Sequence, residues 1–269
     1  MFHFLTVSVY TCVVQIRLLP STFDDAGQAT PEQHLTTLVI DGRVALDAGS
    51  LALSGAAFHN IRDIIITHPH LDHIATLPIF IDDLFGDLEQ PVRVHTTPQI
   101  RDTLEAHIFN WTVYPRFSEL KNQHGPVMEY VPLKMGEPSQ IGHLQVTAVP
   151  VNHSIPTFGL IIDDGARVAV FSSDTAATGE LWQTANSQRR VDAVILECSF
   201  PDTLAQLANN AGHLTPNSLA RELTKLSQRD FAVFAMHLKP AYRDEIMPQL
   251  AALNLPGVTV MLPSHDYSV

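Results

Sequence analysis

The feature that most constrains this chain is a cluster of three histidines and an aspartate that directly follows a short apolar run. The run Ile64–Ile66 is typical of a buried strand, and the motif His-Pro-His-Leu-Asp-His occupies residues 68–73. Imidazole nitrogens and carboxylate oxygens are the usual protein ligands of zinc and related divalent metals. Such a motif arises by chance on the order of once in several hundred chains of this composition. The cluster therefore predicts a metal site rather than a solvated histidine-rich loop.

Three further residues of the ligand type follow β-like runs elsewhere in the chain. His153 comes shortly after the alternating stretch 143–149, Asp174 follows the run 168–173, and His237 follows the run 231–236. A polar side chain at the end of a strand can leave the core and line a cleft. Any one of these residues alone would be an ordinary loop residue. Together with residues 68–73 they indicate several strand ends that converge on a metal centre.

The order of these motifs resembles that of the metallo-β-lactamase superfamily of binuclear hydrolases. Within it, the chain is similar to the class II cyclic-nucleotide phosphodiesterases. The closer similarity rests on the sequences His-Pro-His-Leu-Asp-His-Ile (68–74), Gly-His-Leu-Thr-Pro (212–216) and Met-His-Leu-Lys-Pro (236–240). It extends from about residue 18 to residue 256. The chain departs from the class II pattern after its first strand, where residues 20–27 do not form a glycine-rich turn.

The resemblance implies two metal ions that share seven ligands. One ion would be held by His68, His70 and His153 and the other by Asp72, His73 and His237, with Asp174 as the bridge between them. Two ions about 3.5–4 Å apart can share a hydroxide that attacks phosphorus, and they can neutralise the phosphoryl oxygens. Zinc is the first expectation because most ligands are imidazoles, with manganese or iron as alternatives.

Asp47 resembles the superfamily's aspartate that orients the ligand loop, although it could instead cap the next helix. The predicted catalytic residues are His213 and Asp72. His213 would protonate the 3′-alkoxide leaving group, because imidazole titrates near neutral pH; the alternative is a helix-terminal residue without a catalytic role. Lys239 and Arg243 could contact phosphate or have an ordinary surface role, and His34 is expected to face the cleft.

An aromatic-rich segment interrupts the alternation of strands and helices around residues 96–125. Residues 109–117 contain four aromatic side chains beside a proline and an arginine. One interpretation is a lid in which Trp111 and Tyr114 stack on a purine while Arg116 meets phosphate. The alternative is a capping hairpin or a contact with a second copy of the chain, which leaves a homodimer open.

Composition narrows the class of substrate. Lys and Arg total 16 against 28 Asp and Glu, which gives a formal net charge of −12. A protein that binds a long nucleic acid usually carries a basic stripe, and no run of basic residues here exceeds the pair Arg189–Arg190. Two divalent cations would add positive charge locally. A small phosphodiester is therefore the expected substrate, and a long nucleic acid is not expected.

The cysteines and the first residues bear on location. Cys12 and Cys198 are the only cysteines, so no disulfide framework is implied and a reducing cytoplasm is expected. Cys198 is interpreted as a buried core residue rather than a nucleophile. The apolar stretch 4–14 lacks a basic segment and a cleavage pattern, and it is too short to span a bilayer. It is predicted to be part of a first strand, and no membrane partner is expected.

Strand and helix patterns alternate along all 269 residues, and no linker or repeat divides them. They predict one domain, 1–269, with an α/β (α+β) architecture in the form of an αββα sandwich, and the resemblance implies that this sandwich is of the metallo-β-lactamase type. The predicted strands are 6–18, 35–46, 62–67, 91–95, 126–132, 139–150, 158–171, 192–197, 231–236 and 257–262. The predicted helices are 50–57, 73–86, 98–109, 176–186, 214–228 and 240–252.

Four functions compete. The favoured one is metal-dependent hydrolysis of 3′,5′-cyclic nucleotides such as cyclic AMP or cyclic GMP to 5′-nucleotides. A tRNase Z-like nuclease would share the ligands but should bring a basic exosite or arm. A lactonase or thioesterase would use the same metals on a carboxylic ester, without an acid from residues 212–216. A non-catalytic metal-binding scaffold is the last alternative, and the intact ligand set argues against it.

Overall fold

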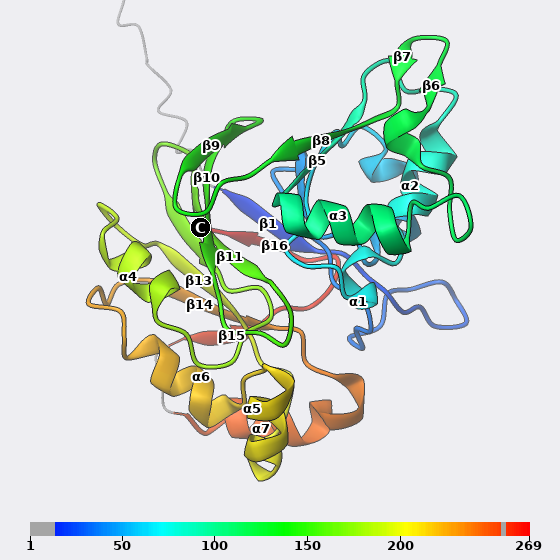
Figure 1. Cartoon of the computed structure of the whole chain (residues 1–269). Coiled ribbons are helices and arrows are strands. Elements are labelled where there is room, and N and C mark those ends of the chain that lie inside the picture. Colours follow the sequence, from blue (N-terminus) through cyan, green and yellow to red (C-terminus); the bar gives the residue numbers. More distant parts are fainter. Residues whose placement is uncertain (1–13, 254–256) are drawn as a thin grey trace, which may run out of the picture.

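The computed structural model describes residues 14–253 and 257–269. Within these residues two seven-stranded sheets lie face to face, and helices cover the outer side of each sheet (Figure 1). This confirms the αββα sandwich that the sequence predicts. Residues 6–13 of the predicted first strand, and Cys12 with them, lie outside the described residues.

The first sheet contains, in spatial order, β16 (Asp266–Ser268), β1 (Gln15–Leu18), β2 (Leu38–Ile40), β3 (Val44–Leu46), β4 (Asp63–Ile65), β5 (Val92–Thr96) and β8 (Met128–Pro132). The second contains β15 (Val258–Val260), β14 (Ala232–Met236), β13 (Ala193–Glu197), β12 (Val168–Phe171), β11 (Phe158–Asp163), β10 (Leu144–Pro150) and β9 (Pro138–Ile141). A short separate hairpin joins β6 (Lys121–Asn122) to β7 (Gly125–Pro126).

The α-helices are α1 (Leu71–Ile74), α2 (Leu77–Leu84), α3 (Pro98–His107), α4 (Glu180–Asn186), α5 (Ala205–Ala211), α6 (Pro216–Leu223) and α7 (Arg243–Ala251). Short 3₁₀ segments are η1 (Leu51–Phe58), η2 (Phe117–Glu119), η3 (Asp202–Leu204) and η4 (Pro240–Tyr242). No helix of the described residues is both long enough and apolar enough to cross a membrane.

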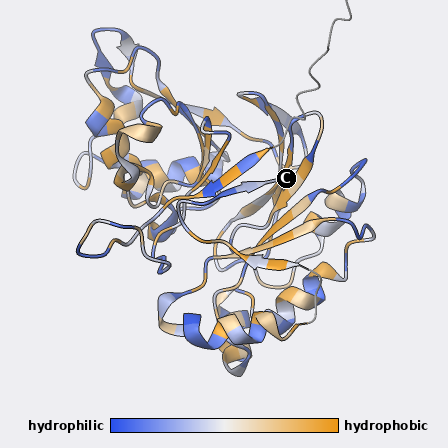
Figure 2. Ribbon diagram, turned by 180° about the vertical axis from the view of Figure 1, so that it is seen from behind, coloured by the Kyte–Doolittle hydropathy of each residue, from blue (hydrophilic) through white to orange (hydrophobic). Residues whose placement is uncertain are grey.

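Two apolar layers hold the sandwich together, and Figure 2 shows hydrophobic residues concentrated along the strands. One layer fills the space between the sheets, where Leu38, Ile65 and Phe158 are fully buried. The other packs the outer side of the second sheet against its helices through residues such as Trp182 and Leu219. Each large apolar side chain buried in this way contributes about 1.5–3 kcal/mol to folding.

Three predicted strands are in fact hairpins, and this is a correction to the sequence analysis. The run 35–46 divides into β2 and β3, the run 139–150 into β9 and β10, and the run 158–171 into β11 and β12. A left-handed glycine lies in each turn: Gly42 at φ 66°, Gly142 at φ 57° and Gly165 at φ 94°. Apolar residues on both sides of a tight turn conceal the turn from a pattern based on hydrophobicity.

The helices also differ from their predicted bounds. The predicted helix 73–86 is broken at Thr76 into α1 and α2, because Pro78 starts a new helix at its first turn. The segment 50–57 is 3₁₀ rather than α-helical, and 240–252 begins as the 3₁₀ turn η4. Helix α5 and strand β16 were not predicted. Thr215 caps α6, with Pro216 in its first turn, where the sequence analysis places a helix start.

Candidate metal centre

Six of the seven predicted ligands follow parallel strands of the two sheets, and His153 follows the antiparallel strand β10. Strands β3, β4 and β5 are parallel neighbours in the first sheet, as are β12, β13 and β14 in the second. Asp47 follows β3, and the motif at residues 68–73 follows β4. Asp174 follows β12 and His237 follows β14. Because the carboxyl ends of parallel strands meet at one edge of a sheet, the fold gathers these side chains in one place.

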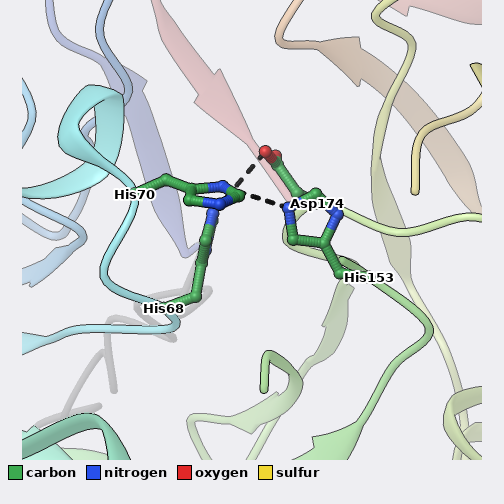
Figure 3. Close-up of side chains that lie close together, drawn as sticks. All are labelled: His68, His70, His153 and Asp174. Atoms are coloured by element: carbon green, nitrogen blue, oxygen red, sulfur yellow. Dashed lines mark hydrogen bonds and ion pairs between the residues drawn. The ribbon is translucent and has the colours of Figure 1, made fainter. Parts of the chain in front are cut away.

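The structure brings all seven predicted ligands together in two groups that share Asp174. Within each group, ligand atoms lie within 4.8 Å of one another. Figure 3 shows the first group, in which His70 Nδ1 lies 3.2 Å from His153 Nε2 and His68 Nε2 lies 3.7 Å from Asp174 Oδ2. The side chains therefore group as the resemblance implies, with Asp174 common to both groups.

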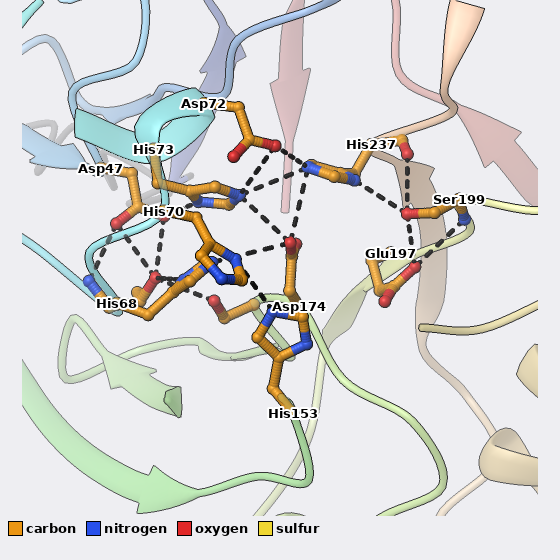
Figure 4. Close-up of polar contacts among 12 residues, drawn as sticks. Asp47, His68, His70, Asp72, His73, His153, Asp174, Glu197, Ser199 and His237 are labelled. Atoms are coloured by element: carbon orange, nitrogen blue, oxygen red, sulfur yellow. Dashed lines mark hydrogen bonds and ion pairs between the residues drawn. The ribbon is translucent and has the colours of Figure 1, made fainter. Parts of the chain in front are cut away.

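The second group lies on the other side of Asp174 (Figure 4). His73 Nε2 is 3.3 Å and His237 Nε2 is 3.6 Å from Asp174 Oδ2. Asp72 Oδ2 is 3.2 Å from His237 Nε2. A single buried carboxylate thus lies in the middle of imidazoles from both sheets.

Unsatisfied nitrogen atoms show that this cluster fits a cation. The Nε2 atom of His68 is buried and has no hydrogen-bond partner among the described residues. Elsewhere in the cluster His73 Nε2 and His237 Nε2 face each other at 3.3 Å. An unpaired buried polar atom is costly, and facing imidazole nitrogens cannot all be satisfied by one another. Divalent cations between them would satisfy these lone pairs, so the residues present fit bound divalent metal ions.

Outer hydrogen bonds fix the orientation of the ligands. Asp47 is fully buried at φ 59°, and its Oδ2 lies 2.7 Å from His73 Nδ1. The same carboxylate accepts hydrogen bonds from the backbone N–H and the hydroxyl of Thr67. These contacts place Asp47 behind the loop 68–73, as the resemblance implies, and they hold His73 so that its other nitrogen would face a bound metal.

Two glycines allow the ligand loops to approach closely. A Cβ atom on Gly49 would lie 2.0 Å from the backbone oxygen of Asp72, and one on Gly212 would lie 2.7 Å from His153 Nδ1. Gly212 also accepts a hydrogen bond from His153 Nδ1 at 2.8 Å through its carbonyl oxygen. Any side chain at either position would displace a predicted ligand.

Burial and charge prepare most of these groups for metal binding. Burial lowers the pKa of His68, His70 and His153, which favours the neutral imidazole that a metal requires. Burial opposes ionisation of Asp174, but His237 and His73 outweigh it and hold the pKa of Asp174 well below its usual range. The pKa of His73 shifts in the opposite direction from those of the other three histidines. Burial lowers it, but the carboxylates of Asp174 and Asp47 outweigh burial and raise it well above the usual value.

His213 lies beside the cluster and is paired with a buried carboxylate. Its Nδ1 is 2.8 Å from Glu197 Oε1 and 4.0 Å from Asp174 Oδ2. The sequence analysis did not identify Glu197 or Ser199 as functional. Glu197 Oε2 accepts a hydrogen bond from the Ser199 hydroxyl. The Oγ atom of Ser199 also lies 2.8 Å from His237 Nδ1. The only signal in the sequence was a pair of polar residues at the end of the apolar run 193–196, which does not identify their partners. The adjacent Cys198 is fully buried, and burial with Glu197 raises the pKa of its thiol.

A cleft of about 380 Å³ adjoins the second group of ligands and includes Asp72 and His237 in its wall. His34 and Lys239, which the sequence analysis proposes for substrate binding, also line it. Arg243 begins α7 one residue after the last residue that lines the cleft.

Of the three other proposed substrate-binding residues, which lie in the aromatic segment, Arg116 and Tyr114 make side-chain contacts within the protein. Arg116 Nε donates to the backbone oxygen of Phe109, and the guanidinium pairs with Glu105 and Glu119. Tyr114 donates to Asp82 and packs on Phe117. Trp111 is 56% exposed. These contacts are those of the capping interpretation of the segment.

The chain is similar in sequence to several curated proteins and in structure to several solved proteins. A curated relative from Yersinia pestis, named "Probable 3',5'-cyclic-nucleotide phosphodiesterase", is 25% identical over 247 residues, which cover 80% of this chain and 70% of that protein. A relative from Clostridium kluyveri named "Ribonuclease Z" is 29% identical over 143 residues, which cover 49% of this chain and 44% of that protein. The crystal structure of unliganded yeast PDE1 superposes with a TM-score of 0.75 at 18% identity, and covers 94% of this chain and 99% of that one.

The family assignment rests on a longer match. Residues 38–237 match the family described as "Beta-lactamase superfamily domain", and this range contains every predicted metal ligand. With the two-sheet fold and the histidine–aspartate cluster already described, the match indicates a metal-dependent hydrolase. The chain belongs to the beta-lactamase superfamily and has the metallo-β-lactamase fold.

Proposed function

We propose that this protein hydrolyses 3′,5′-cyclic nucleotides such as cyclic AMP and cyclic GMP to 5′-nucleotides with two divalent cations, zinc first among them. The observation that carries the proposal is the pairing of two ligand groups through Asp174 with an imidazole, His213, held at their edge. The relative from Yersinia pestis and the likeness to yeast PDE1 support this substrate class.

The chain's own residues would hold the cations and prepare the substrate. His68, His70, His153, Asp72, His73, Asp174 and His237 would be the ligands. When bound, the cations would lower the pKa of a water molecule and neutralise charge on the phosphoryl oxygens. Lys239 and His34, in the wall of the adjoining cleft, are proposed to bind the substrate beside the second ligand group.

His213 is the proposed general acid for the 3′-oxygen that leaves. Burial alone would lower the pKa of His213, but Glu197 outweighs it and raises that pKa, which favours the protonated imidazole. Glu197 accepts a hydrogen bond from His213 Nδ1 and thereby fixes the orientation of the ring. The Nε2 atom of His213 is then left to deliver a proton to the leaving oxygen. Asp72 is proposed to take part by holding the cation nearest the cleft.

The cleft and the net charge favour a small substrate. Its volume of about 380 Å³ accommodates one small molecule. The net charge of −12 opposes a long polyanion, which argues against the nuclease activity suggested by the relative named "Ribonuclease Z". We further propose a cytoplasmic location, because two cysteines imply no disulfide framework. A homodimer that forms through the aromatic segment is a separate proposal.

The test is product analysis with the metal-loaded protein. Zinc- or manganese-loaded protein is given cyclic AMP, cyclic GMP, bis-p-nitrophenyl phosphate and a homoserine lactone, and the products are separated by chromatography. We expect 5′-monophosphates from the cyclic nucleotides, cleavage of the synthetic diester, and an intact lactone. Lactone opening without cleavage of either cyclic nucleotide would replace the proposal with an ester hydrolase.

A further inference from the structure

The cleft beside Asp72 and His237 has a composition suited to a nucleoside. Its wall comes from four separate parts of the chain: the end of β1, residues 33–36, Asp72, and the segment 236–242. The segment 33–36 is tied directly to the ligand loop, because Thr36 N–H donates to the backbone oxygen of Asp72 at 2.7 Å. The cleft is therefore continuous with the metal centre, and a molecule whose phosphate lies on the metals would extend into it.

The lining is apolar and aromatic on some sides and polar on others. Leu35, Met236 and Tyr242 supply apolar surface, while Gln33 and Lys239 supply polar groups. A small-molecule site with mostly apolar walls and a few polar groups fits a flat, partly polar molecule. A nucleobase attached to a ribose has this chemistry, because its faces are apolar and its edges form hydrogen bonds.

Tyr242 is braced as a stacking surface. Its ring lies 5.5 Å from the ring of Phe200 at an interplanar angle of 35°. Phe200 is almost fully buried and also contacts the imidazole of His213 at 5.6 Å. The ammonium of Lys239 lies 5.5 Å from the centre of the same Phe200 ring. One buried ring thus supports an aromatic wall of the cleft, its cation and the proposed acid.

We propose that this cleft is the nucleoside subsite of the enzyme and that Tyr242, rather than Trp111, stacks on the base. The inference rests on the proposed function, because the reacting phosphate must lie on the metal centre. Phe200 is a positioning residue, since it acts through Tyr242, Lys239 and His213. Trp111 lies in the aromatic segment, whose described polar contacts are internal, whereas Tyr242 shares a cleft with two predicted ligands.

The test compares a substrate with a base and one without it. Kinetics of Tyr242→Ala, Tyr242→Phe and the wild type are measured with cyclic AMP and with ribose 3′,5′-cyclic phosphate. We expect Tyr242→Ala to raise KM for cyclic AMP about 5- to 100-fold, the effect of losing one base–aromatic stack, with a small change in kcat. Tyr242→Phe should retain the wild-type KM, and the substrate without a base should show little response to either change.

The outcomes separate the two proposals. Cleavage of neither cyclic phosphate by the metal-loaded wild type would remove the proposed function itself. If the wild type cleaves cyclic AMP, three results overturn the subsite alone: an unchanged KM in Tyr242→Ala, an equal loss on both substrates, or a raised KM in Trp111→Ala only. Thermal melting and metal content of each variant accompany the kinetics, so that an equal loss caused by unfolding is recognised, and Tyr242→Leu then repeats the comparison with a larger apolar side chain.

Discussion

Two regions of this molecule carry unusual concentrations of chemically distinctive residues, and they are used differently. The strand ends around Asp174 hold carboxylates and imidazoles. Some of the imidazole nitrogens face one another, and His68 Nε2 has no hydrogen-bond partner among the described residues. The aromatic segment 109–117 satisfies its polar groups within the first half of the chain, through Glu105, Glu119 and Asp82. Unsatisfied imidazole nitrogens gathered around one buried carboxylate favour a bound cation, whereas the internal partners of Arg116 and Tyr114 favour a structural role for the aromatic segment.

The largest effect should follow from removing the group that the two ligand sets share. Asp174→Asn replaces the central carboxylate with a neutral amide that binds divalent cations poorly. We expect the metal affinity of the variant to fall by more than the roughly 10–100-fold that is typical when a group supporting a ligand is removed. Its activity should be near background. Metal analysis and hydrolysis of bis-p-nitrophenyl phosphate measure this. Normal metal content with normal turnover would exclude Asp174 from the centre.

His213→Ala should have the next largest effect. The cluster of ligands remains complete in this variant, so two metals per chain should still bind. We expect kcat on cyclic AMP to fall roughly 10²–10⁴-fold, the usual contribution of acid catalysis. A diester with a p-nitrophenolate leaving group needs less protonation and should lose less activity, which provides the internal control. Equal losses on both substrates would indicate a structural role for the imidazole.

Asp47→Ala should weaken the centre without dismantling it. The substitution removes the acceptor for His73 Nδ1 and for Thr67 but leaves every predicted ligand in the chain. We expect metal affinity to fall about 10–100-fold, with much of the activity recovered at high metal concentration. Titration with a competing chelator measures the affinity. An unchanged dissociation constant would favour a purely structural role for Asp47.

The pH dependence should distinguish ligands from acid. Protonation of the ligand imidazoles should abolish metal binding and activity at acid pH. Because burial lowers the pKa of His68, His70 and His153, this loss should come below the ordinary imidazole value of about 6.5, and a flat acid limb would contradict the site. On the alkaline side, Glu197 raises the pKa of His213, so the proton-donating form is lost only as the pH rises through that raised pKa. Glu197→Gln removes this stabilisation of the protonated imidazole. The alkaline limb of kcat should therefore move to lower pH, whereas a limb that stays in place would separate Glu197 from the acid.

Much of this centre was predictable from sequence because ligand chemistry is local and strand ends are marked by apolar runs. The motif at residues 68–73, together with His153, Asp174 and His237, needed no knowledge of three-dimensional contacts. Glu197 was not predictable, because an acidic residue after an apolar run has many possible partners and only the parallel pairing of β13 with β12 and β14 shows which one it meets.

The fold, too, was predictable where it depends on apolar runs and not where it depends on backbone angles. Alternating apolar runs predicted two sheets with outer helices, but the turns at Gly42, Gly142 and Gly165 depend on backbone angles that hydrophobic periodicity does not record. The cleft was also only partly predictable. Lys239 was proposed for substrate binding because it follows a predicted ligand, and His34 because it precedes a predicted strand. Tyr242 reaches the cleft through the 3₁₀ turn η4, in a segment predicted to be an ordinary helix.

The smallest effect is expected in the aromatic segment, where it tests the other half of the comparison. Arg116→Ala removes two ion pairs and the hydrogen bond to the Phe109 carbonyl, and Arg101→Ala, which removes an exposed pair with Asp102, is a matched control. Because partly exposed ion pairs contribute little, we expect Arg116→Ala to lower the free energy of unfolding by about 1 kcal/mol and Arg101→Ala by less. Neither change should alter KM for cyclic AMP, since the guanidinium of Arg116 is already engaged by the protein. Urea unfolding and steady-state kinetics measure both quantities, and a raised KM in Arg116→Ala alone would show that this segment, too, reaches the substrate.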